Sequence, residues 1–220
     1  MIGPFWLSRK IASLATILII LVGFPLALGL ARFRFPGKGL LSGLLILPLV
    51  LPPTVLGFVL LKLLGRQGWL GHWLEAACGL TIVFHWSGAV VAAAVAAFPL
   101  FLLPARGALE GVNPAYEDAA RLLGRTELSV LRSITIPLAW RGLVAGSVLA
   151  FARALGDFGT TLMVAGNIPG LTQTASLAIF DAVNADDPAR AGQLALVVAL
   201  TSVLAVAITQ WSLPRSGRRP

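Results

Sequence analysis

Two oppositely charged residues, Arg153 and Asp157, lie inside the long apolar stretch GLVAGSVLAFARALGDFGTTLMVAG. Residues four apart share one face of a helix, so these two can form an ion pair. Charge at membrane depth is costly, and residues that carry it usually face the bundle interior or an aqueous path. A structural ion pair and a direct role in passing an anion are both open interpretations. Thr160 adds a hydroxyl to the same stretch. We take Arg153, Asp157 and Thr160 as candidates for the lining of a translocation pathway.

A second candidate for the pathway is the proline-rich sequence LILPLVLPPTVLGF at residues 45–58. Each proline removes a backbone donor and disfavours helix at the residue before it, which frees carbonyls at membrane depth. Such irregular backbone is tolerated only where it faces protein or a watery cavity. A gate and a packed structural kink are both compatible with this pattern. The candidate pathway residues here are Pro52, Pro53, Thr54 and Gly57.

The chain carries no pattern typical of an enzyme or a metal site. A nucleotide-binding loop has Ser or Thr directly after its Gly-Lys pair, whereas the Gly-Lys pair at residues 37–38 is followed by Gly39. ATP hydrolysis would therefore need a separate subunit. The two histidines, His72 and His85, lack the close helical spacing of a metal pair, and Cys78 is the single cysteine. We therefore expect no catalytic residue, no metal and no cofactor.

The composition is that of a membrane protein. Hydrophobic residues make up 57% of the chain and charged residues 12%, against about 45–50% and about 25% in soluble domains. The net charge of +8 comes from cations at the ends of apolar runs, which indicates orientation in a lipid bilayer and no nucleic-acid partner. Runs of about 20 residues fit a hydrocarbon core of about 30 Å. They predict a single all-α domain, residues 1–220, with about five spans: 11–31, 40–64, 82–104, one beginning near 138, and 191–211.

The distribution of Lys and Arg predicts an N-terminus outside the cytoplasm and a C-terminus inside it. Cytoplasmic loops carry the excess of cations, and this orientation places eleven cations inside and five outside. The flanks of the first span alone do not decide the orientation. The cations expected inside are Arg32, Arg34, Lys38, Arg106, Arg121, Arg125, Arg132, Arg141, Arg215, Arg218 and Arg219.

The longest polar interlude is residues 113–137, NPAYEDAARLLGRTELSVLRSITIP. Its first two residues, Asn-Pro, are typical of a helix start, and two acids follow near the first turn, where the helix dipole favours them. Gly124 ends this helix, and Thr126 can cap a second one. Two short helices outside the bilayer with small and apolar residues make a docking surface.

The same interlude resembles the EAA loop of ABC importer permeases, usually written E-A-A, three residues, G, nine residues, I-x-L-P. Residues 118–120 (Asp-Ala-Ala), Gly124 and 134–137 (Ile-Thr-Ile-Pro) keep this spacing, with Asp in place of Glu and Ile in place of Leu. The resemblance implies that the loop, about residues 106–137, docks in a groove of a cytoplasmic ATPase subunit. The residues it assigns to this coupling are Glu117, Asp118, Ala119, Ala120, Gly124, Ile134 and Pro137.

Further segments look like the permease subunits of molybdate importers, over about residues 9–211. The segments are FPGK at 35–38, LPLVLPP at 47–53, GRQG at 65–68, FPL at 98–100, ALEGV at 108–112, FARALGDFG at 151–159 and NIPG at 167–170. One departure is Asp157, where the resemblance leads us to expect Glu.

The resemblance implies a permease of the type I ABC importer kind in the bacterial inner membrane, forming a homodimer. It also implies two ATPase subunits and a periplasmic oxyanion-binding protein, which we expect to meet the polar segment 167–190. The transported ion would be molybdate or tungstate, moved by alternating access. A sulfate/thiosulfate-type permease is an alternative within this class, and an integral-membrane enzyme is an alternative outside it.

Overall fold

The structure is a computed structural model that describes residues 2–79 and 81–212. Within these ranges the chain is helical and contains no strand, which confirms the all-α fold class. The cations Arg215, Arg218 and Arg219 lie outside the described residues. The elements are α1 (Ile2–Arg32), α2 (Lys38–Val50), α3 (Pro53–Leu64), α4 (Trp69–Cys78), α5 (Trp86–Glu110), α6 (Pro114–Leu122), α7 (Glu127–Val130), a π-helix (Leu131–Thr135), α8 (Ile136–Leu155), α9 (Gly159–Ala165), α10 (Ala175–Asn184) and α11 (Pro188–Ser212).

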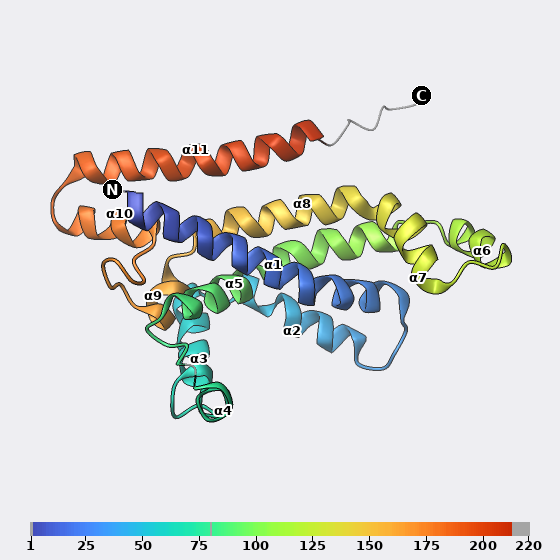
Figure 1. Cartoon of the computed structure of the whole chain (residues 1–220), viewed down its shortest axis with the longest axis horizontal. Helices are drawn as coiled ribbons and strands as arrows, with labels where there is room; N and C mark the ends of the chain where they lie inside the picture. The colour runs from blue at the N-terminus through green and yellow to red at the C-terminus, as the bar shows by residue number, and fades with distance from the viewer. Residues whose placement is uncertain (1, 80, 213–220) are drawn as a thin grey trace.

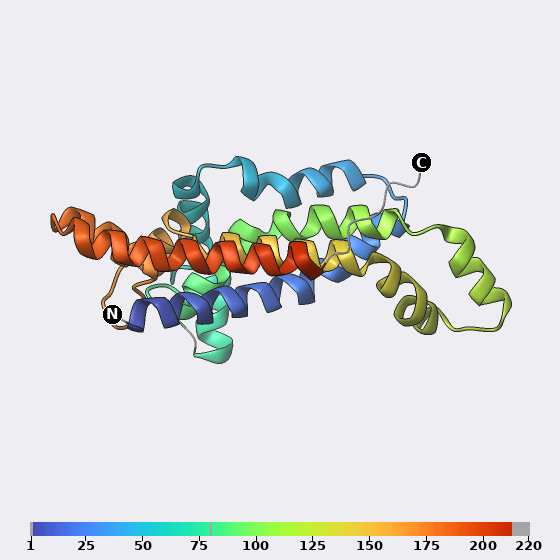
Figure 2. The same ribbon diagram turned by 90° about the horizontal axis from the view of Figure 1, so that it is seen from above.

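The long helices α1, α5, α8 and α11 run along the long axis of the molecule (Figure 1). At one end of this bundle lie α9 and α10. At the other end, which we call the hairpin end, lie α6 and α7. Figure 2 shows the same division from above. Three helical stretches of the described residues are long and apolar enough to cross a membrane, and the bent pair α2–α3 makes a possible fourth. The fifth predicted span falls on α11, a helix of 25 residues.

The centre of the bundle is packed through small residues. Phe101 of α5 lies between α1 and α8, where Gly23 accommodates its ring and Gly146 approaches its backbone. A Cβ atom at residue 146 would lie 2.9 Å from the carbonyl oxygen of Phe101, so a larger residue would push α8 away from α5. Small residues at helix interfaces permit this close approach in membranes. Fully buried alanines extend the contact along α5 at Ala89, Ala92, Ala93 and Ala97.

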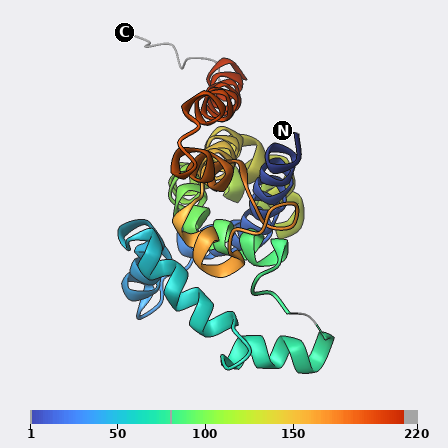
Figure 3. The same cartoon turned by 90° about the vertical axis from the view of Figure 1, so that its left-hand side faces the viewer.

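The predicted second span, 40–64, is not one straight helix. The chain bends by 115° between α2 and α3, at the Pro52–Pro53 pair. Leu51, the residue before the first proline, adopts an extended conformation, as the steric conflict with a following proline ring requires. The predicted irregular backbone is therefore confirmed. Viewed along the bundle, α3 and α4 extend sideways from it (Figure 3).

Other predicted boundaries also differ from the structure, and the first helix begins at Ile2 rather than near residue 11. The third helix, predicted over 82–104, begins at Trp86, because the ring nitrogen of His85 accepts a hydrogen bond from the Ser87 backbone at 3.3 Å and caps it. The same helix runs on to Glu110. The fourth begins before residue 138, since α7, the π-helix and α8 form one continuous helical stretch from Glu127 to Leu155.

Candidate functional site

The polar hairpin, which we define as residues 113–130, folds as the sequence predicts. The side-chain oxygen of Asn113 accepts a hydrogen bond from the Ala115 backbone at 3.0 Å and caps α6. Gly124 follows with a φ of +79°, a conformation that favours glycine. The Thr126 hydroxyl caps α7 by accepting from the Ser129 backbone at 3.4 Å. The second helix differs from the prediction only in that it continues into α8.

The outer side of the polar hairpin is apolar and open. It projects past the other helices at its end of the bundle (Figures 1 and 2). Leu122 is 89% exposed and Leu123 84% exposed, and the Tyr116 ring is also exposed. Large apolar side chains this exposed, set among polar residues, mark a surface that contacts another molecule.

The predicted coupling residues divide into an exposed and a buried set. Asp118, Ala119, Gly124 and Pro137 are exposed, Ile134 is half-buried, and Glu117 and Ala120 are buried. This division follows from the helix period, because residues 117 and 120, three positions apart, lie on the side of α6 that faces the bundle. The coupling role of all seven stays a prediction.

The buried acid of the polar hairpin, Glu117, is held by two residues that the sequence analysis did not connect with it. Its carboxylate accepts hydrogen bonds from the Arg32 guanidinium and from the Thr135 hydroxyl, the latter at 2.6 Å. Only 4% of Glu117 is exposed, so this carboxylate depends on these partners for its solvation. We call these three residues the hairpin network.

Arg121 joins the two helices of the polar hairpin at its surface. Its guanidinium donates to Asp118 at 2.7 Å and to Glu127 at 2.7 Å. The hydrogen bonds that Arg121 donates, first to Glu127 and then to Asp118, raise the pKa of Arg121 above its usual value, and the bond that Glu127 accepts lowers the pKa of Glu127. Because Arg121 and Glu127 are exposed to water, this pairing adds little stability.

The predicted ion pair between Arg153 and Asp157 is present. Arg153 donates to one oxygen of Asp157 at 2.9 Å, and the other oxygen accepts from the backbone and hydroxyl of Thr161 at 2.9 and 2.7 Å. The acid does not lie on the same helix as the arginine, because α8 ends at Leu155. Asp157 instead spans the break between α8 and α9. We call Arg153, Asp157 and Thr161 the α8–α9 network, and its full set of bonds favours the structural interpretation of the pair.

The pathway candidates of the proline-rich segment meet those of α9. A Cβ atom at Gly57 would lie 2.7 Å from the Met163 Cβ and 3.2 Å from the Thr160 Cα, so α3 and α9 are in close contact. Thr160 is fully buried there, and its hydroxyl has no hydrogen-bond partner among the described residues. The exposed candidates are Pro52, Pro53 and Thr54. Their role in a pathway stays a prediction.

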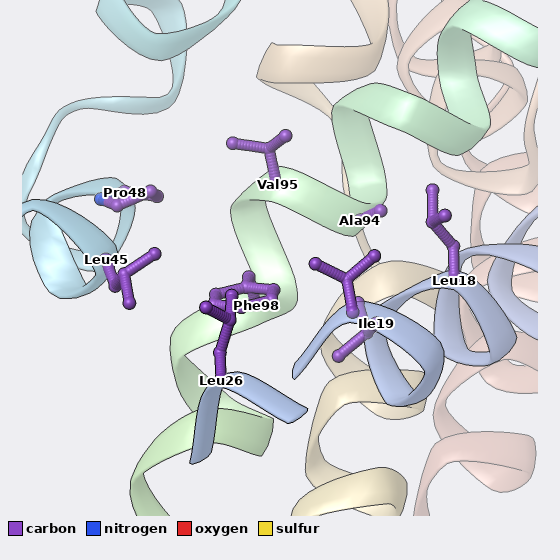
Figure 4. A pocket seen from close by; sticks show the side chains of 9 residues that line it. Leu18, Ile19, Leu26, Leu45, Pro48, Ala94, Val95 and Phe98 are labelled. Atoms are coloured by element: carbon purple, nitrogen blue, oxygen red, sulfur yellow. The ribbon is translucent and has the colours of Figure 1, made fainter. Parts of the chain in front are cut away.

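A separate cavity of about 320 Å³ lies between α1, α2 and α5. Figure 4 shows that its labelled side chains are all apolar and that Pro48 of α2 is among them. Such a lining gives an oxyanion no hydrogen-bond donor, so we do not assign this cavity to the pathway. Its lining residues are Leu18, Ile19, Val22, Leu26, Leu45, Pro48, Ala94, Val95 and Phe98.

Three members of the two networks were not predicted from the sequence: Arg32, Thr135 and Thr161. Thr161 could have been found, because it follows Asp157 by four residues and can donate to it from the next helix. Arg32 and Thr135 carried no such signal: Arg32 is 85 residues from Glu117 in the chain. Among the described residues, no group of three His, Cys, Asp or Glu side chains is placed to hold a metal ion.

Residues 19–218 match a protein family described as binding-protein-dependent transport system inner membrane component. The chain belongs to this family. It is therefore a multi-pass inner-membrane transport component rather than an enzyme, and it works with a substrate-binding protein.

Individual relatives agree with this assignment. The molybdenum transport system permease protein ModB of Escherichia coli (strain K12) is 42% identical over 224 aligned residues, covering 98% of each chain. The sulfate transport system permease protein CysT of Salmonella typhimurium is 36% identical over 218 residues, covering 99% of this chain and 78% of that one. An inward-facing structure of the MetNI methionine ABC transporter has the same fold, with a TM-score of 0.67, 16% identity and coverage of 97% of this chain and 96% of that chain.

Proposed function

We propose that this chain is the membrane-spanning permease subunit of an ATP-driven ABC importer that moves molybdate, or tungstate, across the inner membrane. The observation that carries the proposal is the polar hairpin, a capped pair of short helices with two almost fully exposed leucines beyond the end of a membrane bundle. A subunit that docks there can supply the energy that this chain, without a nucleotide-binding loop, does not.

The partners follow from the two ends of the bundle. A cytoplasmic ATPase binds the polar hairpin, and the periplasmic oxyanion-binding protein binds the opposite end, near α9 and α10. This arrangement requires the N-terminus outside and the C-terminus in the cytoplasm, in agreement with the excess of cations at the hairpin end. Two copies of the chain form the importer, each with its ATPase, and nucleic acid has no part in it.

The transport step is alternating access between the two sides of the membrane. Closure of the two ATPases moves the polar hairpins, and the helices that continue from them transmit this movement to the opposite end. In the closed arrangement the α3–α9 contact at Gly57 and Thr160 shuts the path. Separation of α3 from α9 would expose the Thr160 hydroxyl, whose unused donor can bind a passing oxyanion.

Molybdate is favoured over sulfate by the degree of likeness to relatives with each name. The identity is 42% to a molybdenum permease of nearly equal length, and 36% to a sulfate permease of which the chain covers 78%. A sulfate/thiosulfate permease is thus the second candidate. Both ions are tetrahedral dianions, so the same pathway chemistry serves either.

Uptake by the complete importer tests the proposal. The chain, its ATPase and its binding protein would be reconstituted in proteoliposomes loaded with ATP, and uptake of radioactive molybdate followed with and without excess sulfate. We expect molybdate uptake to need all three components and sulfate not to compete with it. Competition at equimolar sulfate would identify a sulfate permease, and a correctly inserted complex that moves neither ion would refute the proposed function.

The docking surface has its own test. Leu122→Asp combined with Leu123→Asp should abolish co-purification of the ATPase, since two charges would enter an apolar contact. Leu171→Asp is the matched control, because Leu171 is exposed at the opposite end of the bundle. Loss of the ATPase in the control, or its retention in the hairpin variant, would exclude the docking assignment.

A further inference from the structure

Three helix ends meet at the carboxylate of Glu117. Arg32 is the last residue of α1, Glu117 lies in the first turn of α6, and Thr135 is the last residue of the π-helix that leads into α8. The dipole of α1 favours a cation at its C-terminus, and that of α6 favours an anion at its N-terminus. Both charges are therefore stabilised where they stand, and their pairing links two helices that are remote in sequence.

This link spans a gap. A cavity of about 570 Å³ separates the end of α1, where Leu28, Arg32 and Phe33 line it, from the polar hairpin and the π-helix. Among the described residues, α1 and α6 approach each other at few other points. Within the part of the chain that the structure describes, this ion pair is the only hydrogen bond or ion pair between the first helix and the polar hairpin, although α1 packs along α5 and α8 over its length.

Arg32 and Glu117 differ in how far water reaches their side chains. The Arg32 side chain is 25% exposed, so water can solvate it without its partner, whereas the Glu117 side chain is 5% exposed. Glu117 accepts its charged hydrogen bond from Arg32, since its other cation, Arg121, lies 3.9 Å away, and the hydrogen bond that it accepts from Thr135 fixes the π-helix to the same point. A π-helical turn inside an α-helix is often found at functional sites.

We propose that Arg32 is a positioning residue of the importer: through Glu117 it makes α1 move as one body with the polar hairpin and the start of α8. The inference rests on the proposed function, because it concerns how movement of the docked ATPase reaches the membrane helices. Without Arg32 the polar hairpin still docks on the ATPase. Its movement is then transmitted only in part to the membrane helices, and α1 does not follow it.

The test measures transport per ATP hydrolysed in proteoliposomes holding the complete importer. Arg32→Gln should keep the co-purified ATPase and its unstimulated hydrolysis, and should lower molybdate uptake per ATP at least tenfold. Arg32→Lys, which keeps the charge, should restore part of the ratio. Arg34→Gln is the matched control, an exposed arginine two residues further along. An unchanged ratio in Arg32→Gln, while the unsubstituted importer transports, would overturn the inference; an unsubstituted importer that does not transport would instead overturn the proposed function.

A double variant separates pairing from independent effects. If Arg32 acts through Glu117, then Arg32→Gln with Glu117→Gln should lose no more of the ratio than either single variant, because residues that share one interaction are not additive. Losses that multiply in the double variant would show that the two residues act separately.

A cross-link tests whether the two segments stay together through the cycle. Cysteines replacing Arg32 and Glu117, in a Cys78→Ala background, would be joined by a short bis-maleimide. Since the native pair holds α1 and the polar hairpin as one body, the cross-linked importer should regain the uptake that the unlinked cysteine variant lacks. Complete arrest of uptake by the cross-link would show that the pair must open and would contradict the inference.

Discussion

The hairpin network and the α8–α9 network use the same three kinds of side chain for different tasks. Each places a buried acid between an arginine and a threonine hydroxyl. In the α8–α9 network all three residues lie within nine positions of the chain, and the acid joins two consecutive helices. In the hairpin network the partners come from α1, α6 and the π-helix, and the acid joins segments 85 residues apart.

This difference shows what each network can transmit. A network closed within nine residues fixes a local shape, because its members move together whether or not the rest of the bundle moves. A network between distant helices instead couples their positions, since displacement of one pulls on the others. We therefore expect loss of the first to reduce stability most, and loss of the second to reduce transport most.

The largest effect on stability is expected for Asp157→Ala. The substitution removes a carboxylate that is 1% exposed and leaves the Arg153 guanidinium and the backbone and hydroxyl of Thr161 without their acceptor, and removing one partner of such a buried network costs about 3–5 kcal/mol. The thermal unfolding midpoint of the purified importer in detergent should fall accordingly. The midpoint of Asp157→Asn should fall less, because its amide oxygen still accepts hydrogen bonds from Thr161. Equal losses in the two variants would mean that the hydrogen bonds to α9 contribute nothing.

A smaller loss of stability is expected for Glu117→Ala, about 2–3 kcal/mol, because Glu117 accepts two hydrogen bonds where Asp157 accepts three. The same unfolding measurement provides the comparison, and uptake per ATP should fall more steeply than the midpoint. If Glu117→Ala lowers the unfolding midpoint as much as Asp157→Ala does, the two networks contribute equally to stability, which would contradict the difference in role drawn between them.

Two glycines, one beside each network, sharpen the contrast further. Gly57→Ala should destabilise by about 1–2 kcal/mol, because the added methyl group meets Met163 and the backbone of Thr160. Gly124→Ala meets open space but adopts a φ of +79°, which costs about 1 kcal/mol through local backbone strain alone. Gly43→Ala, within α2 and also in open space, is the control and should be neutral or slightly stabilising. Thermal unfolding in detergent ranks the three, and a different order would contradict the packing described for α3 and α9.

The smallest effect concerns the exposed acid Glu127, whose pKa is lowered by its hydrogen bond to Arg121. A lowered pKa in the folded state means that the bond stabilises the polar hairpin above the ordinary pKa of Glu and is lost as pH falls through the lowered value. The difference in unfolding midpoint between Glu127→Gln and the unsubstituted chain should therefore be small at neutral pH and vanish in acid. A difference that grows on acidification would reverse the sign of this linkage.

The parts of the structure that follow from local chemistry were predictable from the sequence. The Asn113 and Thr126 caps, the turn at Gly124, the break at Pro52–Pro53 and the pairing of Arg153 with Asp157 all depend on residues a few positions apart. The burial of Glu117 did not follow in this way. The motif treats residues 117–120 as a docking segment, whereas the helix period turns one acid inward to Arg32 and the other outward, and only the packing of α1 decides which acid that is.

The helix α8 has a mechanical consequence that follows from its length. Thr135 and Arg153 are separated by 18 residues, so the two networks lie about 27 Å apart at opposite ends of one helix. A stiff rod that pivots about its middle swings its two tips in opposite directions by equal amounts. A displacement of α8 toward the bundle axis at the hairpin end would thus become an outward displacement of Asp157 at the opposite end, and α9 would move away from Gly57 with it.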